Sequence, residues 1–159
     1  MKFIKELIPY IIIVIVVILI RSFIVTPVKV NGASMYPTLD GGEIMILNKL
    51  GKIDRFDIVV LSVDNDDNVI KRVIGMPGET IEIENNHIYI NEEKIEDKYG
   101  YGKTYNTDKI TLKEDEYFVL GDNRAISLDS RVFGPVKKKD ISGTASLVLY
   151  PFNKIGIVK

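Results

Sequence analysis

The stretch LIPYIIIVIVVILIRSFIV, residues 7–25, divides this sequence of 159 residues into an apolar start and a globular remainder. Between Tyr10 and Ile20 the tyrosine hydroxyl is the only polar group on any side chain. A helix needs about 20 apolar residues to cross a bilayer core, and this run reaches that length with Arg21 at the outer boundary. The pattern predicts one transmembrane helix over residues 7–25, and no second apolar run of this length follows.

The flanks of this run favour a permanent anchor over a cleavable signal peptide. A cleavage site needs small residues in an Ala-x-Ala pattern, which the segment SFIVTPVK (22–29) lacks. Lys2 and Lys5 predict that the tail of residues 1–6 stays in the cytoplasm. We therefore expect residues 26–159 on the extracytoplasmic face of the cell membrane, with the lipid bilayer as one partner.

Composition excludes several classes of function. The 21 basic and 22 acidic residues nearly cancel, which argues against a nucleic-acid partner. The absence of cysteine and the single histidine, His87, exclude a cysteine nucleophile and a zinc site built from protein ligands alone. We expect no cofactor and no metal. His87 follows Asn85 and Asn86 in a polar hairpin, so it is expected at the surface rather than in a catalytic triad.

Beyond residue 26, short runs rich in Ile, Val and Tyr are separated by Gly, Asn, Asp and Pro, which predicts a mainly β fold in small antiparallel sheets. Ile81 and Ile83 alternate with glutamates, and a turn is expected at residues 85–86. The polar segment 91–116 is expected to be a loop. The candidate strands are Val28–Val30, Ile44–Asn48, Ile58–Val63, Val69–Met76, Thr80–Glu84, His87–Ile90, Tyr117–Leu120 and Thr144–Leu149.

A first candidate for catalysis is the segment GASMYPTL, residues 32–39. Ser34 follows two small residues, so another chain can approach it closely from one side, and Pro37 fixes the backbone just after it. A plain turn between two strands is the simpler explanation of this segment taken alone.

A second candidate is VIKRVIGMPG, residues 69–78, which places two cations in an apolar strand. Lys71 shares one face with Val69 and Val73, and Arg72 points to the other face. Burial disfavours the charged form of an amine, so a desolvated lysine can become neutral and act as a general base, which an arginine cannot. The alternative is that both aliphatic stems pack while both charged ends reach solvent.

A third candidate is GDNRAISLDSRVFG, residues 121–134, which follows a clear strand. Two aspartates and two arginines lie within ten residues, with Ser127 and Ser130 between them. This density of paired charge predicts a rigid, hydrogen-bonded loop, and a solvated surface loop is the alternative.

Together the three segments resemble the conserved boxes of the bacterial type I signal peptidases (leader peptidases), in the form typical of single-membrane bacteria. SMYPTL resembles the nucleophile box, KRVIGMPG the lysine box and GDNRAISLDSRVFG the third signature of that family. RFDIVV, residues 55–60, resembles the short box between the first two. The order, the spacing and the single amino-terminal anchor agree with the family over essentially the whole chain.

The resemblance implies a membrane-bound serine endopeptidase that removes signal peptides from exported preproteins after small residues (Ala-x-Ala) through an acyl-enzyme. Ser34 would be the nucleophile, its backbone N–H would donate to the oxyanion, and Lys71 would be the general base. Ser127 would orient the lysine amine. The implied supporting residues are Asp129, Arg131, Asp122 and Arg124. The expected walls of the substrate pockets are Val28, Val30, Met35, Leu39 and Ile70.

The fold that the resemblance implies is a pair of antiparallel β-domains, with the smaller one, near residues 79–116, inserted in the larger. Two positions depart from the pattern of some relatives. Gly32 stands where relatives from bacteria with an outer membrane often have a serine hydroxyl as a second oxyanion donor. Glu79 replaces the usual aspartate after the Pro-Gly pair.

Two alternatives predict other functions. A serine–lysine peptidase of the self-cleaving repressor type would work in the cytoplasm behind a DNA-binding segment, and the apolar anchor argues against it. A catalytically silent, membrane-tethered β module would only bind a partner, and the presence of Ser34, Lys71 and Ser127 argues against that.

Overall fold

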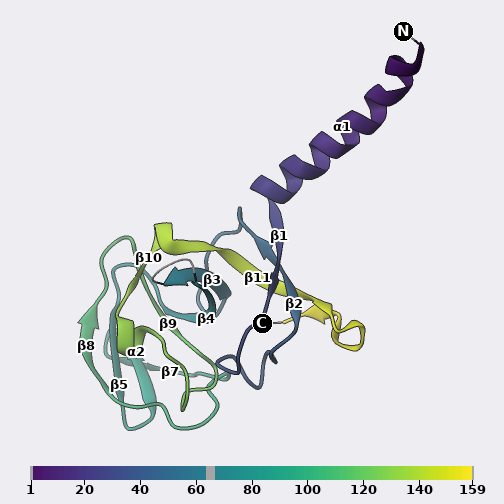
Figure 1. The fold of residues 1–159 in the computed structure, drawn as a ribbon. Helices are drawn as coiled ribbons and strands as arrows, with labels where there is room; N and C mark the ends of the chain where they lie inside the picture. Colours follow the sequence, from purple (N-terminus) through teal and green to yellow (C-terminus); the bar gives the residue numbers. More distant parts are fainter. Residues whose placement is uncertain (1, 64–66, 159) are drawn as a thin grey trace.

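The computed structural model describes residues 2–63 and 67–158, in which a long apolar helix stands away from a β body (Figure 1). Helix α1 spans Lys2–Phe23. Its window Glu6–Phe23 is long and apolar enough to cross a membrane, with a mean hydropathy of 2.4, and none of it is buried inside the protein. These uncovered apolar side chains require an apolar surrounding other than the protein itself, so α1 fits the expected anchor.

The helix ends two residues earlier than the apolar pattern predicts. Val25 continues the apolar run, but it begins strand β1 (Val25–Lys29) and lies opposite Asn48 in the register with the neighbouring strand. Pairing with the β body therefore determines this boundary, which hydrophobicity alone cannot define. At the other end, α1 already includes most of the segment expected as the cytoplasmic tail, from Lys2 onward.

The remaining elements are mostly short strands. After β1 these are β2 (Ile44–Asn48), β3 (Ile58–Val63), β4 (Asp67–Gly75), β5 (Thr80–Glu84), β6 (His87–Ile90), β7 (Glu93–Ile95), β8 (Thr107–Thr111), β9 (Glu116–Leu120), β10 (Val136–Lys137), β11 (Ile141–Tyr150) and β12 (Gly156–Ile157). The short helical turns are α2 (Ser130–Phe133), η1 (Lys138–Asp140) and η2 (Phe152–Lys154).

The strands form two antiparallel sheets, which confirms the predicted fold class. The larger sheet has the order β1-β2-β11-β3-β4-β9-β10, with β12 paired to β11. The smaller sheet has the order β7-β6-β5-β8 and lies within residues 80–111. Figure 1 shows the smaller sheet on the side of the body away from α1.

The segment 91–116, expected to be a loop, contains β7 and β8, so that expectation is wrong. In β8 Ile110 is the one large apolar residue, too little for a recognisable alternation. Pairing with β5 determines this strand instead: Thr111 lies opposite Thr80, and Ile110 lies opposite Ile81. The strand therefore forms because an open sheet edge is available to it.

The hairpin predicted at residues 85–86 is present. Asn85 and Asn86 have positive φ values of 50° and 67°, as a tight two-residue hairpin turn requires. The turn aligns the isoleucines of β5 with those of β6 on one face. These side chains pack with Ile74, Phe118 and Leu120 of the larger sheet, and this apolar cluster joins the two sheets.

Candidate active site

The side chains of Ser34 and Lys71 are in direct contact beside the larger sheet. Ser34 lies in the turn that follows β1, and Lys71 lies in the middle of β4. Lys71 Nζ is 2.9 Å from Ser34 Oγ and donates a second hydrogen bond of 3.1 Å to the carbonyl of Ile70. An amine in direct contact with a hydroxyl is the arrangement that proton transfer from the hydroxyl requires.

Burial sets the charge of the Lys71 amine. The residue is 3% exposed, and its stem lies in strand β4 beside the buried Ile70. This burial lowers the pKa of Lys71, while the negative charges of Asp129 and Asp122 act in the opposite direction without cancelling it. Desolvation therefore makes the neutral amine accessible at lower pH than in an exposed lysine.

The loop of residues 121–134 holds the turn that contains Ser34 in place. The backbone N–H of Asn123 donates to the carbonyl of Ser34 at 3.0 Å, and the Asn123 side-chain amide donates to the carbonyl of Ala33 at 3.2 Å. Asn123 was not among the predicted site residues. A pairing between loops 90 residues apart leaves no local pattern in the sequence.

Gly121 lies between the two serines of the site. Its N–H donates to Asp129 Oδ2 at 3.0 Å, and its carbonyl accepts from Arg124 Nε at 2.9 Å. A Cβ at this position would stand 2.6 Å from the carbonyl oxygen of Ser34 and would collide with the hydroxyl of Ser127. The close approach of Ser34 and Ser127 therefore requires glycine here.

We expect Gly121→Ala to lower the rate of peptide cleavage on the order of 10²-fold, because it displaces the Ser34 backbone by a fraction of an ångström or more. Gly156→Ala is the matched control, since the nearest atom to its added Cβ would be 4.0 Å away. The rates are compared at saturating substrate, with circular dichroism as a check on folding. Equal rates for Gly121→Ala and the control would contradict this packing.

A buried ion pair lies directly behind Lys71. Arg72 donates to Asp122 through Nε at 2.8 Å and through Nη2 at 2.6 Å, and both side chains are 0% exposed. Arg72 Nη1 also donates to the carbonyl of Phe56, and the guanidinium stacks 3.7 Å from the ring centre of Tyr99. Arg72 was not predicted as a site residue, although its place between apolar residues indicated burial.

The other predicted charges of the loop are also paired. Arg124 forms an ion pair with Asp97 of the segment between β7 and β8. Arg131 holds Asp129 through Nε and Nη2, both at 2.8 Å. The charged side chains of the loop are therefore paired and mostly buried, so the alternative in which they are solvated is wrong.

The role expected of Ser127 stays a prediction. Its hydroxyl is buried beside Gly121, and no hydrogen bond to it is present within residues 2–63 and 67–158. The residues expected to form the pocket walls gather in one cluster: Val30, Met35, Leu39 and Ile70 are buried, with Val28 packed against them. His87 is exposed, as predicted.

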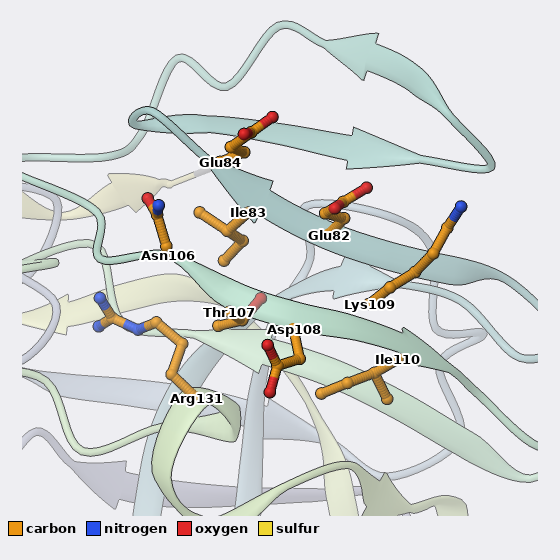
Figure 2. Close-up of a pocket in the computed structure, with 9 residues that line it drawn as sticks. All are labelled: Glu82, Ile83, Glu84, Asn106, Thr107, Asp108, Lys109, Ile110 and Arg131. Atoms are coloured by element: carbon orange, nitrogen blue, oxygen red, sulfur yellow. The ribbon is translucent and has the colours of Figure 1, made fainter.

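A groove of about 570 Å³ lies beside this loop but apart from the dyad. Figure 2 shows acidic side chains of β5 at the top, the residues of β8 in the middle and Arg131 at the lower left. Neither Ser34 nor Lys71 lines this groove.

The sequence also matches known proteins. The model of the family described as signal peptidase, peptidase S26, matches residues 3–150. Signal peptidase I S of Bacillus subtilis (strain 168) is 42% identical over 89% of this chain and 86% of its own length. Signal peptidase I of Streptococcus pneumoniae serotype 4 is 36% identical over 98% of this chain and 97% of its own length.

A crystal structure of a signal peptidase I from Enterococcus faecalis V583 has the same fold. It superimposes with a TM-score of 0.53 at 37% sequence identity, and the match covers 59% of this chain and 97% of that chain. The chain therefore belongs to the signal peptidase family, peptidase S26, and is a serine endopeptidase.

Proposed function

We propose that this chain is a membrane-anchored endopeptidase that uses a Ser34–Lys71 dyad to remove signal peptides from exported preproteins. The observation that supports it most strongly is the 2.9 Å contact between Lys71 Nζ and Ser34 Oγ, in a lysine that is 3% exposed. The names of the relatives support the substrate class, since each is a signal peptidase I.

The neutral amine of Lys71 takes the proton of the Ser34 hydroxyl as Oγ attacks the carbonyl carbon of the scissile bond. The resulting ammonium then gives this proton to the leaving nitrogen, so the peptide bond breaks and an acyl-enzyme ester remains. Water, deprotonated by the same amine, attacks the ester and restores Ser34. One base thus serves both halves of the reaction.

Negative charge on the carbonyl oxygen needs a donor fixed in advance. We assign the backbone N–H of Ser34 to this role. Gly32 provides no side-chain hydroxyl as a second donor, and its φ of +77° belongs to the left-handed region that favours glycine. The shape of the turn thus accounts for glycine at this position.

The substrate has a place to bind as an extended strand. Strand β9 pairs with β4 from Arg72 onward, so among the described residues the half of β4 before Arg72 has only β3 as a neighbour. The free edge leads directly to Lys71, and an added strand gains main-chain hydrogen bonds there. The walls proposed for the small side chains of an Ala-x-Ala sequence are Val28, Val30, Met35, Leu39 and Ile70, the apolar cluster beneath Ser34.

The supporting residues act on the charge of the dyad. Asp129 and Asp122 raise the pKa of Lys71, so their own charges must be balanced if the amine is to stay neutral. Arg131 and Arg72 provide that balance by direct pairing. We assign Ser127 the role of orienting the amine, because its buried hydroxyl lies against the same glycine as Ser34.

The proposed topology follows the charge around α1. Lys2 and Lys5 favour a cytoplasmic amino terminus, which puts the β body on the extracytoplasmic face of the cell membrane. Preproteins emerge from the membrane on that face, so the free edge of β4 would be available to a signal peptide that is still held in the bilayer.

The function is tested by cleavage of a purified preprotein that ends its signal peptide in Ala-x-Ala, by the full chain in detergent, across a range of pH. We expect cleavage after the second alanine, with an acid limb along which the rate rises with pH as Lys71 loses its proton. Because burial lowers the pKa of Lys71, the limb lies below the ordinary lysine value of about 10.4.

His87→Asn is the matched control, since it removes the single imidazole of the chain, the other candidate for a general base. The acid limb should be unchanged in this variant. A limb that disappears in His87→Asn would contradict the assignment of the base, and absence of cleavage at every pH would favour a binding module.

A further inference from the structure

The joint between α1 and the β body is fixed by side chains, not by the covalent link alone. One residue separates the end of α1 at Phe23 from the start of β1. Lys49, in the turn between β2 and β3, donates from Nζ to the carbonyl of Ser22 at 2.9 Å and from its backbone N–H to the carbonyl of Ile24 at 2.9 Å. Thr26 Oγ1 donates to the carbonyl of Arg21 at 2.9 Å.

These contacts satisfy groups that a helix end leaves open. The last carbonyls of a helix have no partner within the helix and carry partial negative charge, which a lysine ammonium neutralises. The turn that carries Lys49 is therefore held against the end of α1. Movement of the turn away from this helix end would break both hydrogen bonds of Lys49.

The height of this turn follows from the length of the anchor. The apolar window Glu6–Phe23 has 18 residues, or about 27 Å at 1.5 Å per residue, close to the thickness of a bilayer core. Phe23 then lies at the boundary between hydrocarbon and headgroups. The turn bonded to Ser22 lies in the same layer.

The exposed surface of the turn suits that layer. Leu50 stands at the tip with 71% of its surface exposed, and it belongs to none of the buried apolar clusters of the described residues. Lys49 and Lys52 flank it, and Arg21 is exposed on the adjoining helix end. Lys52 pairs with Asp54 at 3.0 Å, and both side chains are exposed.

We propose that the turn Lys49–Lys52 is a second membrane contact, in which Leu50 enters the interface and the flanking cations bind the headgroups of anionic lipids. The proposal rests on α1 lying in the bilayer, and it is continuous with that contact. An apolar side chain between cations suits the membrane interface, where hydrocarbon lies next to negatively charged headgroups. The contact would hold the β body, and with it the free edge of β4, in one orientation to the membrane.

The absence of cysteine from the chain makes a direct test possible. Leu50→Cys is labelled with an environment-sensitive fluorophore in the full chain, which is reconstituted into vesicles of phosphatidylcholine with or without phosphatidylglycerol. Lys109→Cys on β8, exposed and in the smaller sheet, is the matched control (Figure 1). Lipids that carry a nitroxide near the headgroup report contact by quenching.

We expect severalfold stronger quenching at position 50 than at position 109, and more of it when phosphatidylglycerol is present. Adding Lys52→Gln to the Leu50→Cys chain should weaken the contact about fivefold, the usual effect of one basic residue at an anionic surface. Quenching at position 50 no stronger than at position 109 would overturn the proposal, as would quenching that ignores phosphatidylglycerol. This readout needs no cleavage, so it fails or succeeds independently of the proposed peptidase activity.

Discussion

Replacing Lys71 with methionine should abolish preprotein cleavage and leave the fold intact. Methionine has a similar length and can occupy the same buried space, but it cannot accept the proton of Ser34. Loss of a general base lowers a rate by on the order of 10²–10⁴-fold, and the loss here is at the upper end because the same amine serves both acylation and deacylation. The measurement is the single-turnover rate of cleavage.

Two further variants test whether the loss of cleavage in Lys71→Met is specific to the dyad. Ser34→Ala should be equally inactive, because it removes the attacking atom. Lys113→Met, which removes an exposed lysine paired with Glu116, should cleave at the normal rate. Wild-type cleavage by Lys71→Met, or equal cleavage by Ser34→Ala and the unmodified chain, would contradict the assigned dyad.

The same replacement has a pH-dependent effect on stability. The pKa of Lys71 is lower in the folded chain than in the unfolded one, so between the two values the unfolded chain binds more protons. The free energy of unfolding therefore rises with pH across this window. Relative to the unmodified chain, Lys71→Met should be more stable near neutral pH, and its advantage should shrink as the pH approaches about 10.4. Denaturant unfolding at several pH values measures this difference.

Arg72→Met should destabilise the folded chain by about 3–5 kcal/mol, the largest loss that we expect from a single substitution. The loss of stability comes from the partner that remains, Asp122, rather than from the missing contacts of the arginine. Asp122 is 0% exposed and accepts two hydrogen bonds from the guanidinium, so the variant leaves a buried carboxylate without a counter-ion. The measurement is the free energy of unfolding by urea.

The double variant Arg72→Met with Asp122→Leu separates charge from packing. Replacing both members of a buried ion pair with apolar residues is often close to neutral, so much of the lost stability should return. The double variant removes Asp122, whose charge raises the pKa of Lys71, together with the Arg72 charge that balances it, so the acid limb of cleavage should shift little. A double variant as unstable as Arg72→Met alone would show that the arginine acts through packing and not through its charge.

The anchor and most strands are visible in the sequence because each is defined by its own hydrophobic pattern. The run ending at Ile20 needs no partner to be recognised, and the hairpin at Asn85 and Asn86 combines alternation with a local turn signal. Strand β8 lacks such a pattern. Its pairing with β5 is decided by the neighbouring strand, which no local property of residues 107–111 reveals.

In the candidate site, too, some features follow from local sequence and others depend on distant residues. The charge density of residues 121–134 predicted correctly that these charges are paired, but it did not reveal the partners outside the loop. Asp122 pairs with Arg72, 50 residues earlier, rather than with an arginine of its own loop. The reason is the register of β4 and β9, which places Arg72 opposite Leu120 and so beside the residues that follow that strand. Contacts of this kind depend on strand pairing, and pairing depends on the whole sheet.

The mechanism requires that Lys71 carry a neutral amine at the pH of catalysis. Nuclear magnetic resonance of the full chain in detergent, with lysine labelled at Cε and Nζ, measures the titration of each amine, and Lys71→Met identifies the signal of Lys71 by its loss. We predict that this signal titrates below all other lysines and at the same pH as the acid limb of cleavage. A Lys71 amine that titrates with the exposed lysines, near about 10.4, would contradict the account.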